Sequence, residues 1–194
     1  MTVVLIIGLF IALAAPSLAR IFDDRRAANI TDDISGMFRV ARTRSSSTGG
    51  AHAVRVTVAG TGLKFELMQA IDPSTGALST KSPVPSCMSP SWAKGSPDVQ
   101  LLQTIDPSND PTLVSKGIYA VPGPTGTSVG VFCFTPGGST WWLDGTGGGA
   151  WRRPSVSDNL FFEVVRFDSL GRQLGVTREV HVGTSGIPHV EVHG

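Results

Sequence analysis

Apolar and polar positions divide the chain into a short first part and a long second part. From Thr2 to Ala15 nearly every residue is apolar, and no charged residue precedes Arg20. As a helix rising 1.5 Å per residue, the run to Leu18 would extend roughly 27 Å, which just suffices to cross a bilayer. Three structures fit this pattern: a cleaved secretion signal, a membrane anchor, or the apolar half of a longer helical stem.

The segment after Arg20 has the spacing of a helix with one apolar face. Charged residues fill the opposite face, and the Ser-, Thr- and Gly-rich residues 45–50 end the pattern. The apolar positions recur at i, i+4, i+7, i+8 and i+11, and are Ile30, Ile34, Met37, Phe38 and Ala41. The charged positions expected toward solvent are Arg25, Arg26, Asp32, Asp33, Arg39 and Arg42.

Pro16 is the one helix-disrupting residue between these two segments. A proline can bend a helix and leave it continuous. We therefore expect one long bent helix over residues 1–48, the stem, followed by a β-rich globular domain over residues 49–194, the head. The alternative is a signal cleaved after Ala19, because Ser17-Leu18-Ala19 fits a small-x-small site, although the positively charged start of such signals is missing.

Short alternating segments predict an antiparallel sheet in the head. Residues 54–58 alternate, 60–62 turn the chain and 63–68 return, as in a β-hairpin. Residues 72–124 are rich in Pro, Ser, Gly and Asp, which predicts a long excursion with few strands. The further strands are expected at 99–105, 118–121, 129–134, 160–167, 176–182 and 189–193. With no second helix expected after Ser45, the predicted fold class is α+β: a long N-terminal helix, transmembrane and then amphipathic, packed on an antiparallel β-sheet.

The net charge bears on whether nucleic acid is a partner, and the two cysteines bear on whether the protein contains a disulfide. The 194 residues carry 16 basic and 15 acidic side chains, so the net charge of +1 creates no general attraction for nucleic acid. Cys87 and Cys133 lie outside any CxxC or zinc-site spacing. In an exported protein they would form a disulfide worth roughly 4 kcal/mol in the chain-entropy model. Two buried, unpaired thiols are the alternative.

Two polar segments could bind a metal, and each also has a simpler interpretation. DPSNDP at 106–111 and the loop after Asp144 are rich in oxygen ligands, yet their spacing does not fit an EF-hand, so turns are expected. His189, Glu191 and His193 alternate and would share one strand face, which is chemically adequate for a metal. No further ligand is marked in the sequence, so exposed polar residues at a strand end are expected, with no metal and no cofactor.

The tryptophans leave two interpretations open, and the search for catalytic motifs finds none. Trp141, Trp142 and Trp151 surround a glycine run and form either an exposed contact patch for a neighbouring subunit or a partly buried cover over the sheet. No GxSxG, HExxH, P-loop or GxGxxG motif occurs. The expectation is a protein without enzymatic activity and without a small-molecule substrate.

The apolar start resembles the stem of type IV pilins and pseudopilins. In that family an apolar stretch contains a glycine and, eight residues later, a proline, and Gly8 and Pro16 stand at this separation within MTVVLIIGLFIALAAPSL. The family's leader and its FTLIE-like motif are missing. Aligned on Pro16, Met1 falls at the seventh position of a mature pilin, so the resemblance implies a late start of the reading frame or a truncation.

Two further stretches are similar to the GspH/FimT type of minor pilin and pseudopilin. DDISGMFRVARTRSSSTGGAHAVRVTV at 32–58 resembles that family's helix end and first strand, and REVHVGTSGIPHVEV at 178–192 resembles its closing hairpin. Some relatives take up DNA through basic residues near the C-terminus. The last sixteen residues here contain no Lys or Arg, so a nucleic-acid partner is not expected.

The resemblance implies a non-catalytic subunit of a type II secretion pseudopilus or a type IV pilus. Such a protein would sit in the bacterial inner membrane by a single span, with its head in the periplasm, and would then pack with other pilins in a periplasmic or cell-surface filament. Gly8 and Pro16 would give the helix flexibility. The expected membrane and filament packing residues are Leu5, Ile6, Leu9, Phe10 and Leu13. The alternative is an exported or membrane-anchored β-rich binding domain that does not assemble into filaments.

Overall fold

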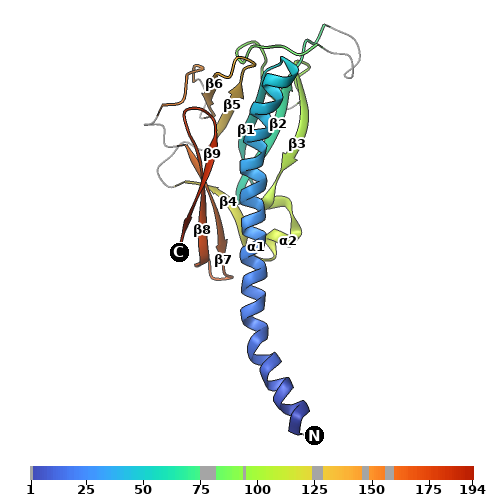
Figure 1. Cartoon of the computed structure of the whole chain (residues 1–194). Coiled ribbons are helices and arrows are strands. Elements are labelled where there is room, and N and C mark those ends of the chain that lie inside the picture. The colour runs from blue at the N-terminus through green and yellow to red at the C-terminus, as the bar shows by residue number, and fades with distance from the viewer. Residues whose placement is uncertain (1, 75–81, 94, 124–128, 146–148, 156–159) are drawn as a thin grey trace.

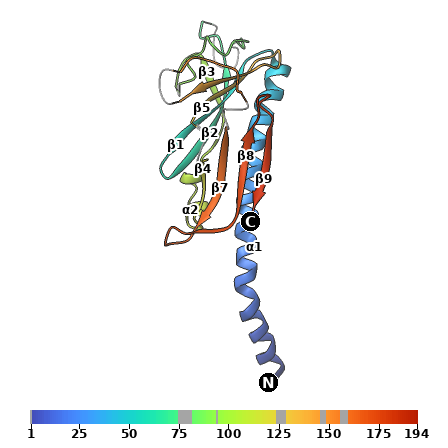
Figure 2. The ribbon, with the colours of Figure 1, turned by 90° about the vertical axis from the view of Figure 1, so that its left-hand side faces the viewer.

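A single long helix, α1 (Thr2–Thr48), begins the chain and is continuous through Pro16. The computed structural model describes residues 2–74, 82–93, 95–123, 129–145, 149–155 and 160–194, and within α1 it describes the side chains of Leu18 and of Ile21 onward. Figures 1 and 2 show the later half of α1 lying along the strands and its earlier half continuing past them. One helix therefore serves both as a layer of the head and as a projection from it.

The face of α1 that packs on the head is the one that the sequence predicts. Ile34, Met37, Phe38 and Ala41 are at most 2% exposed, and Ile30 is partly buried against them. The charged side chains of the opposite face are exposed or half-buried. The spacing of apolar residues therefore identified the buried face of this helix correctly.

Nine strands form two antiparallel sheets in the described part of the chain. The five-stranded sheet has the order β3-β2-β1-β5-β6, and the four-stranded sheet has the order β4-β7-β8-β9. The first comprises β1 (His52–Ala59), β2 (Gly62–Ala70), β3 (Val99–Ile105), β5 (Gly130–Phe134) and β6 (Thr140–Asp144). The second comprises β4 (Ile118–Pro122), β7 (Phe161–Phe167), β8 (Gln173–Val182) and β9 (Pro188–His193).

The predicted fold class of one helix on one sheet is wrong. The molecule is mostly antiparallel β-structure in two sheets, and α1 contacts strands of both. Between β3 and β4 the chain also forms a 3-10 turn (Pro107–Asn109) and a short helix, α2 (Pro111–Val114), where no second helix was expected. The alternation of a strand shows which residues face the core, but it does not show which strands pair.

The predicted location in the membrane is also wrong. In the part of the chain that the structure describes, no helix is both long enough and apolar enough to cross a bilayer. This finding overturns the prediction of a single-pass inner-membrane protein with its head in the periplasm.

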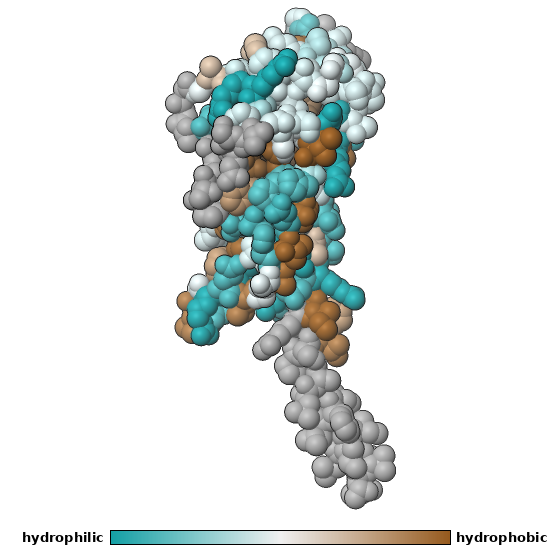
Figure 3. All heavy atoms as spheres, turned by 60° about the vertical axis from the view of Figure 1, so that its left-hand side comes forward, coloured by the Kyte–Doolittle hydropathy of each residue, from teal (hydrophilic) through white to brown (hydrophobic). Residues whose placement is uncertain are grey.

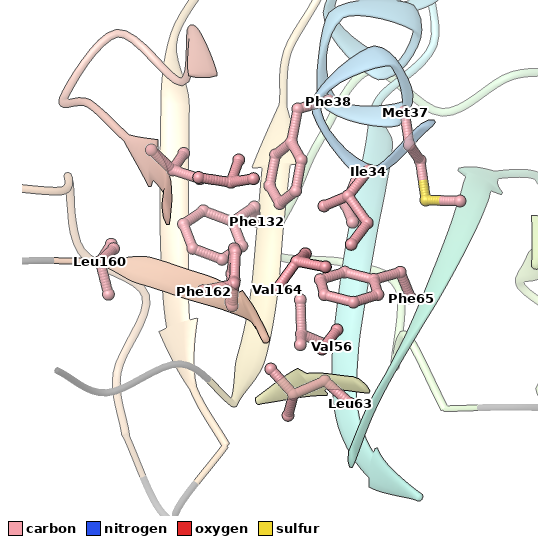
Figure 4. Packing of buried hydrophobic residues seen from close by; sticks show 14 of the residues in the cluster. Ile34, Met37, Phe38, Val56, Leu63, Phe65, Phe132, Leu160, Phe162 and Val164 are labelled. Carbon is pink, nitrogen blue, oxygen red and sulfur yellow. The ribbon is translucent and has the colours of Figure 1, made fainter. Parts of the chain in front are cut away.

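The main core lies between α1 and the inner faces of both sheets (Figure 4). The ring of Phe38 lies 5.2 Å, centroid to centroid, from Phe132 of β5 and 6.0 Å from Phe162 of β7. Phe65 of β2 meets Phe162 edge-on at 5.3 Å. Edge-to-face and stacked rings at these separations are favourable beyond the area they bury. This aromatic cluster connects the three layers.

A second core covers the outer face of the five-stranded sheet. Residues 82–93 and 95–98 bring Cys87 and Trp92 onto this face, where both are 2% exposed. Cys87 forms a disulfide with Cys133 of β5 over a Cα–Cα distance of 5.9 Å, which confirms the expected bridge. The indole Nε1 of Trp92 donates a 2.8 Å hydrogen bond to the Cys87 carbonyl. The proline-rich excursion is thus anchored as a cover for the sheet.

The tryptophans near the glycine run pack into the head. Trp142 is fully buried in the main core, and Trp141 and Trp151 are half-buried against the second core. Partial burial over the sheet is therefore correct for Trp141 and Trp151, whereas Trp142 is fully buried. Trp141 and Trp142 belong to β6, which the sequence analysis did not predict.

Candidate functional site

Exposed apolar side chains surround the point where α1 leaves the head. Leu18, Ile21 and Phe22 are 51%, 48% and 57% exposed, and Figure 3 shows hydrophobic spheres at this level of the helix. Apolar side chains left in water next to one another mark a contact surface more often than scattered ones do. We define Leu18, Ile21 and Phe22 as the exit patch.

Charged groups hold the helix just above the exit patch. The Nη1 atom of Arg166, on β7, lies 3.6 Å from Asp23 Oδ2 and 3.8 Å from Asp24 Oδ1. Arg166 is only 12% exposed, so these attractions are screened less than those of surface pairs. The pairs fix the position of α1 relative to the four-stranded sheet at the last turn before the helix projects.

The other end of α1 is held by backbone acceptors of two turns. Arg42 Nη1 donates to the Ser185 carbonyl at 2.6 Å, in the turn between β8 and β9. The Ser45 hydroxyl lies 3.3 Å from the Thr135 carbonyl, after β5. Each turn belongs to a different sheet, so α1 is tied to both sheets at its C-terminal end.

An open cleft of about 750 Å³ lies beside the helix exit. Asp23 of α1, Tyr119 of β4, Arg166 of β7 and Leu174 of β8 contribute to its walls, together with the segment after α2. The cleft combines a cation, a carboxylate and apolar side chains at the same end of the head as the exit patch. It enlarges the surface that a neighbouring molecule would meet there.

The predicted packing residues lie outside the side chains that the structure describes. Leu5, Ile6, Leu9, Phe10 and Leu13, with Gly8 and Pro16, fall in helical turns of α1 whose side chains are not described. The exit patch begins directly after this segment and was not singled out by the sequence analysis. Its apolar residues do not continue the spacing of the buried face, which is the signal that could have identified them.

The aspartate-rich segment forms turns, as expected. Asp106 Oδ1 accepts a 2.8 Å hydrogen bond from the Ser108 hydroxyl, and Asp110 Oδ1 accepts one of 2.8 Å from the Thr112 amide at the start of α2. These are the bonds of a turn and a helix N-cap. In the loop after Asp144, residues 146–148 lie outside the described part of the chain.

The alternating residues of β9 meet polar residues of β8 on the outer face of the four-stranded sheet. The register pairs Glu191 with Glu179, and His189 with His181. Glu179 in turn pairs with Glu163 of β7. Burial and the nearby carboxylate of Glu179 raise the pKa of Glu163 above its usual value. Sequence reasoning identified the β9 residues but missed their partners, because the partners depend on strand register.

Comparisons with known proteins do not identify a family. No family model, no curated protein and no solved structure matches the chain. The similarity to type IV pilins and pseudopilins therefore stays a prediction from the sequence.

Proposed function

We propose that this chain is a non-catalytic subunit of a filament, of the minor pilin or pseudopilin kind, in a type II secretion pseudopilus or a type IV pilus. Neighbouring helix-bearing subunits would contact the N-terminal part of α1 and the exit patch. The head would determine which neighbours fit on the outside of the filament.

The length of α1 carries this proposal. The helix has 47 residues, roughly 70 Å at 1.5 Å per residue, whereas helices of globular proteins average about 10–14 residues. Within the described side chains, burial against the head extends from Ala27 to Ser45. Figure 1 shows the first part of α1 continuing past the strands of the head, so a helix of this length is best explained by contacts with another molecule.

The chemistry at the exit supports the same proposal. The exit patch is apolar and lies beside the ion pairs of Arg166, so it is presented on a fixed part of the helix. The residues before it, from Thr2 to Ala15, are nearly all apolar in sequence. Packing such a surface among similar helices removes it from water, at about 25 cal/mol per Å² of apolar area.

A photo-crosslinker at the exit patch tests the proposal. A benzophenone amino acid would replace Phe22, which is 57% exposed, in cells that produce the protein natively. The matched control places the same probe at Leu170, which is 75% exposed in the turn between β7 and β8. We expect adducts from position 22 with a second protein bearing a long N-terminal helix, identified by mass spectrometry of the linked peptides, and none of these from position 170.

Two outcomes would contradict the proposal. Equal yields from positions 22 and 170 would show that the exit patch has no preferred neighbour. Adducts from position 22 only to proteins without such a helix would favour an exported binding domain that does not assemble.

A further inference from the structure

Histidine and glutamate side chains gather on the outer face of β7, β8 and β9. Three of the chain's four histidines and three of its four glutamates occupy this face, and His52 and Glu66 are the exceptions. The strand register places Glu163, Glu179 and Glu191 side by side in one row across the three strands. On one side of this row lie the paired His181 and His189, and on the other side lies His193. We call these six residues the His/Glu face.

Three of the six residues of this face bring ligand atoms close together. One atom each from Glu179, Glu191 and His193 lies within 4.8 Å of the others. His193 Nε2 is 3.5 Å from Glu179 Oε1 and 3.8 Å from Glu191 Oε2. Four ligands placed tetrahedrally around a zinc ion at 2.0–2.2 Å are about 3.4 Å from one another. The two separations from His193 are therefore close to those that a metal would impose.

Neighbouring rings hold these ligands in place. His181 Nε2 lies 2.8 Å from Glu179 Oε2, and the His181 ring stacks between Phe161 at 5.0 Å and His189 at 5.1 Å. His189 Nε2 in turn lies 3.2 Å from Glu191 Oε1. Imidazoles that orient carboxylate ligands in this way resemble the outer shell of metal sites, where such partners set the affinity.

We propose that the His/Glu face binds one divalent transition-metal ion through Glu179, Glu191 and His193, with His181 and His189 as positioning residues. Carboxylates of the same sign on adjacent strands repel one another, and a cation between them removes that repulsion. An imidazole ligand selects zinc, copper, nickel or cobalt, whereas calcium takes oxygen ligands. Zinc is the probe of choice because it does not change its oxidation state.

The site would link the last two strands. Glu179 lies on β8, and Glu191 and His193 lie on β9, so a bound ion connects both members of the C-terminal hairpin. Strand β9 is the edge of the four-stranded sheet. A ligand that binds the folded state alone raises the midpoint of thermal unfolding. Zinc should therefore raise this midpoint in the unmodified protein.

Calorimetric titration of the tag-free full-length chain with zinc chloride tests the proposal. We expect saturable binding of one ion per chain, and an affinity that Glu179→Gln and His193→Gln each lower at least tenfold. Zinc should also raise the midpoint of thermal unfolding of the parent, and both variants should lose this rise. Asp33→Asn is the matched control, because it removes an exposed carboxylate on α1, and it should bind like the unmodified chain. Cooperative thermal unfolding of each variant without zinc shows that all are folded.

Several outcomes would overturn the proposal. Absence of saturable zinc binding would do so, and so would equal affinities of the parent and both variants. A parallel titration with calcium chloride tests the class of ion. Calcium binding as tight as zinc binding, and unaffected by His193→Gln, would exclude a transition-metal site.

Discussion

At the scale of single residues, Glu66 on β2 shows how a charge is tolerated in the second core. Its side chain is only 1% exposed, with Lys64 Nζ at 2.9 Å from Oε1 and Arg55 Nε at 2.9 Å from Oε2. Burial alone raises the pKa of Glu66, but the hydrogen bonds and charges of Lys64 and Arg55 outweigh it and bring the pKa below the usual 4.5. The carboxylate is therefore held ionised in the folded protein.

This arrangement predicts a pH dependence. Below pH 4.5 the unfolded chain takes up a proton on Glu66 before the folded chain does, so the free energy of unfolding falls as pH drops from 4.5 through the folded pKa. Glu66→Gln should be less stable at pH 7 and should lose less stability over that acid range. Urea unfolding between pH 3 and pH 7 measures both. Parallel curves for parent and variant would contradict the role given to Glu66.

At the scale of elements, the packing of α1 on both sheets depends on few side chains. Phe38 touches a ring from each sheet, while its helix neighbour Val40 is 37% exposed. Phe38→Ala should lower the free energy of unfolding by about 3–5 kcal/mol, because it leaves a cavity where three layers meet. Val40→Ala, the matched control, should change it by about 0.5 kcal/mol or less. Urea unfolding at pH 7 compares them, and similar losses would show that α1 does not depend on this contact.

Sequence patterns predicted the elements better than their arrangement. The buried face of α1 and the β1–β2 hairpin follow from periodicity, and the strands at 99–105 and 118–121 were found within a turn-rich segment. Strand β6 was missed because its two tryptophans adjoin glycine-rich turns. Helix α2 was missed because four residues are too few to show a period.

For the candidate sites too, the sequence identified residues but did not show which of them meet in the fold. Both cysteines were identified, but their bridge required β5 and the covering segment to meet. The alternation of His189, Glu191 and His193 was visible in the sequence. Their convergence with Glu179 and His181 depends on the register of β8 and β9, which a single sequence does not specify.

At the scale of the whole molecule, the protein consists of a head with two hydrophobic cores and a helix, α1, that projects from it. The head buries one face of the later half of α1, and the C-terminal end of the helix is hydrogen-bonded to turns of both sheets. The ion pairs of Arg166 lie next to the exit patch. Figure 1 shows the earlier half of the helix continuing past the strands. The exit patch and the apolar sequence before it lie on the projecting side. The proposed function needs this projection to stay attached to the head in the native protein.

The N-terminal residue of the protein purified from its own cells tests that requirement most directly. Mass spectrometry of the intact chain and of its N-terminal peptide would determine it. We predict a native protein that retains the apolar segment, including Gly8 and Pro16, joined to the head. A native protein that begins at Arg20 would contradict the proposal, because the segment proposed to join neighbouring subunits would have been removed on export.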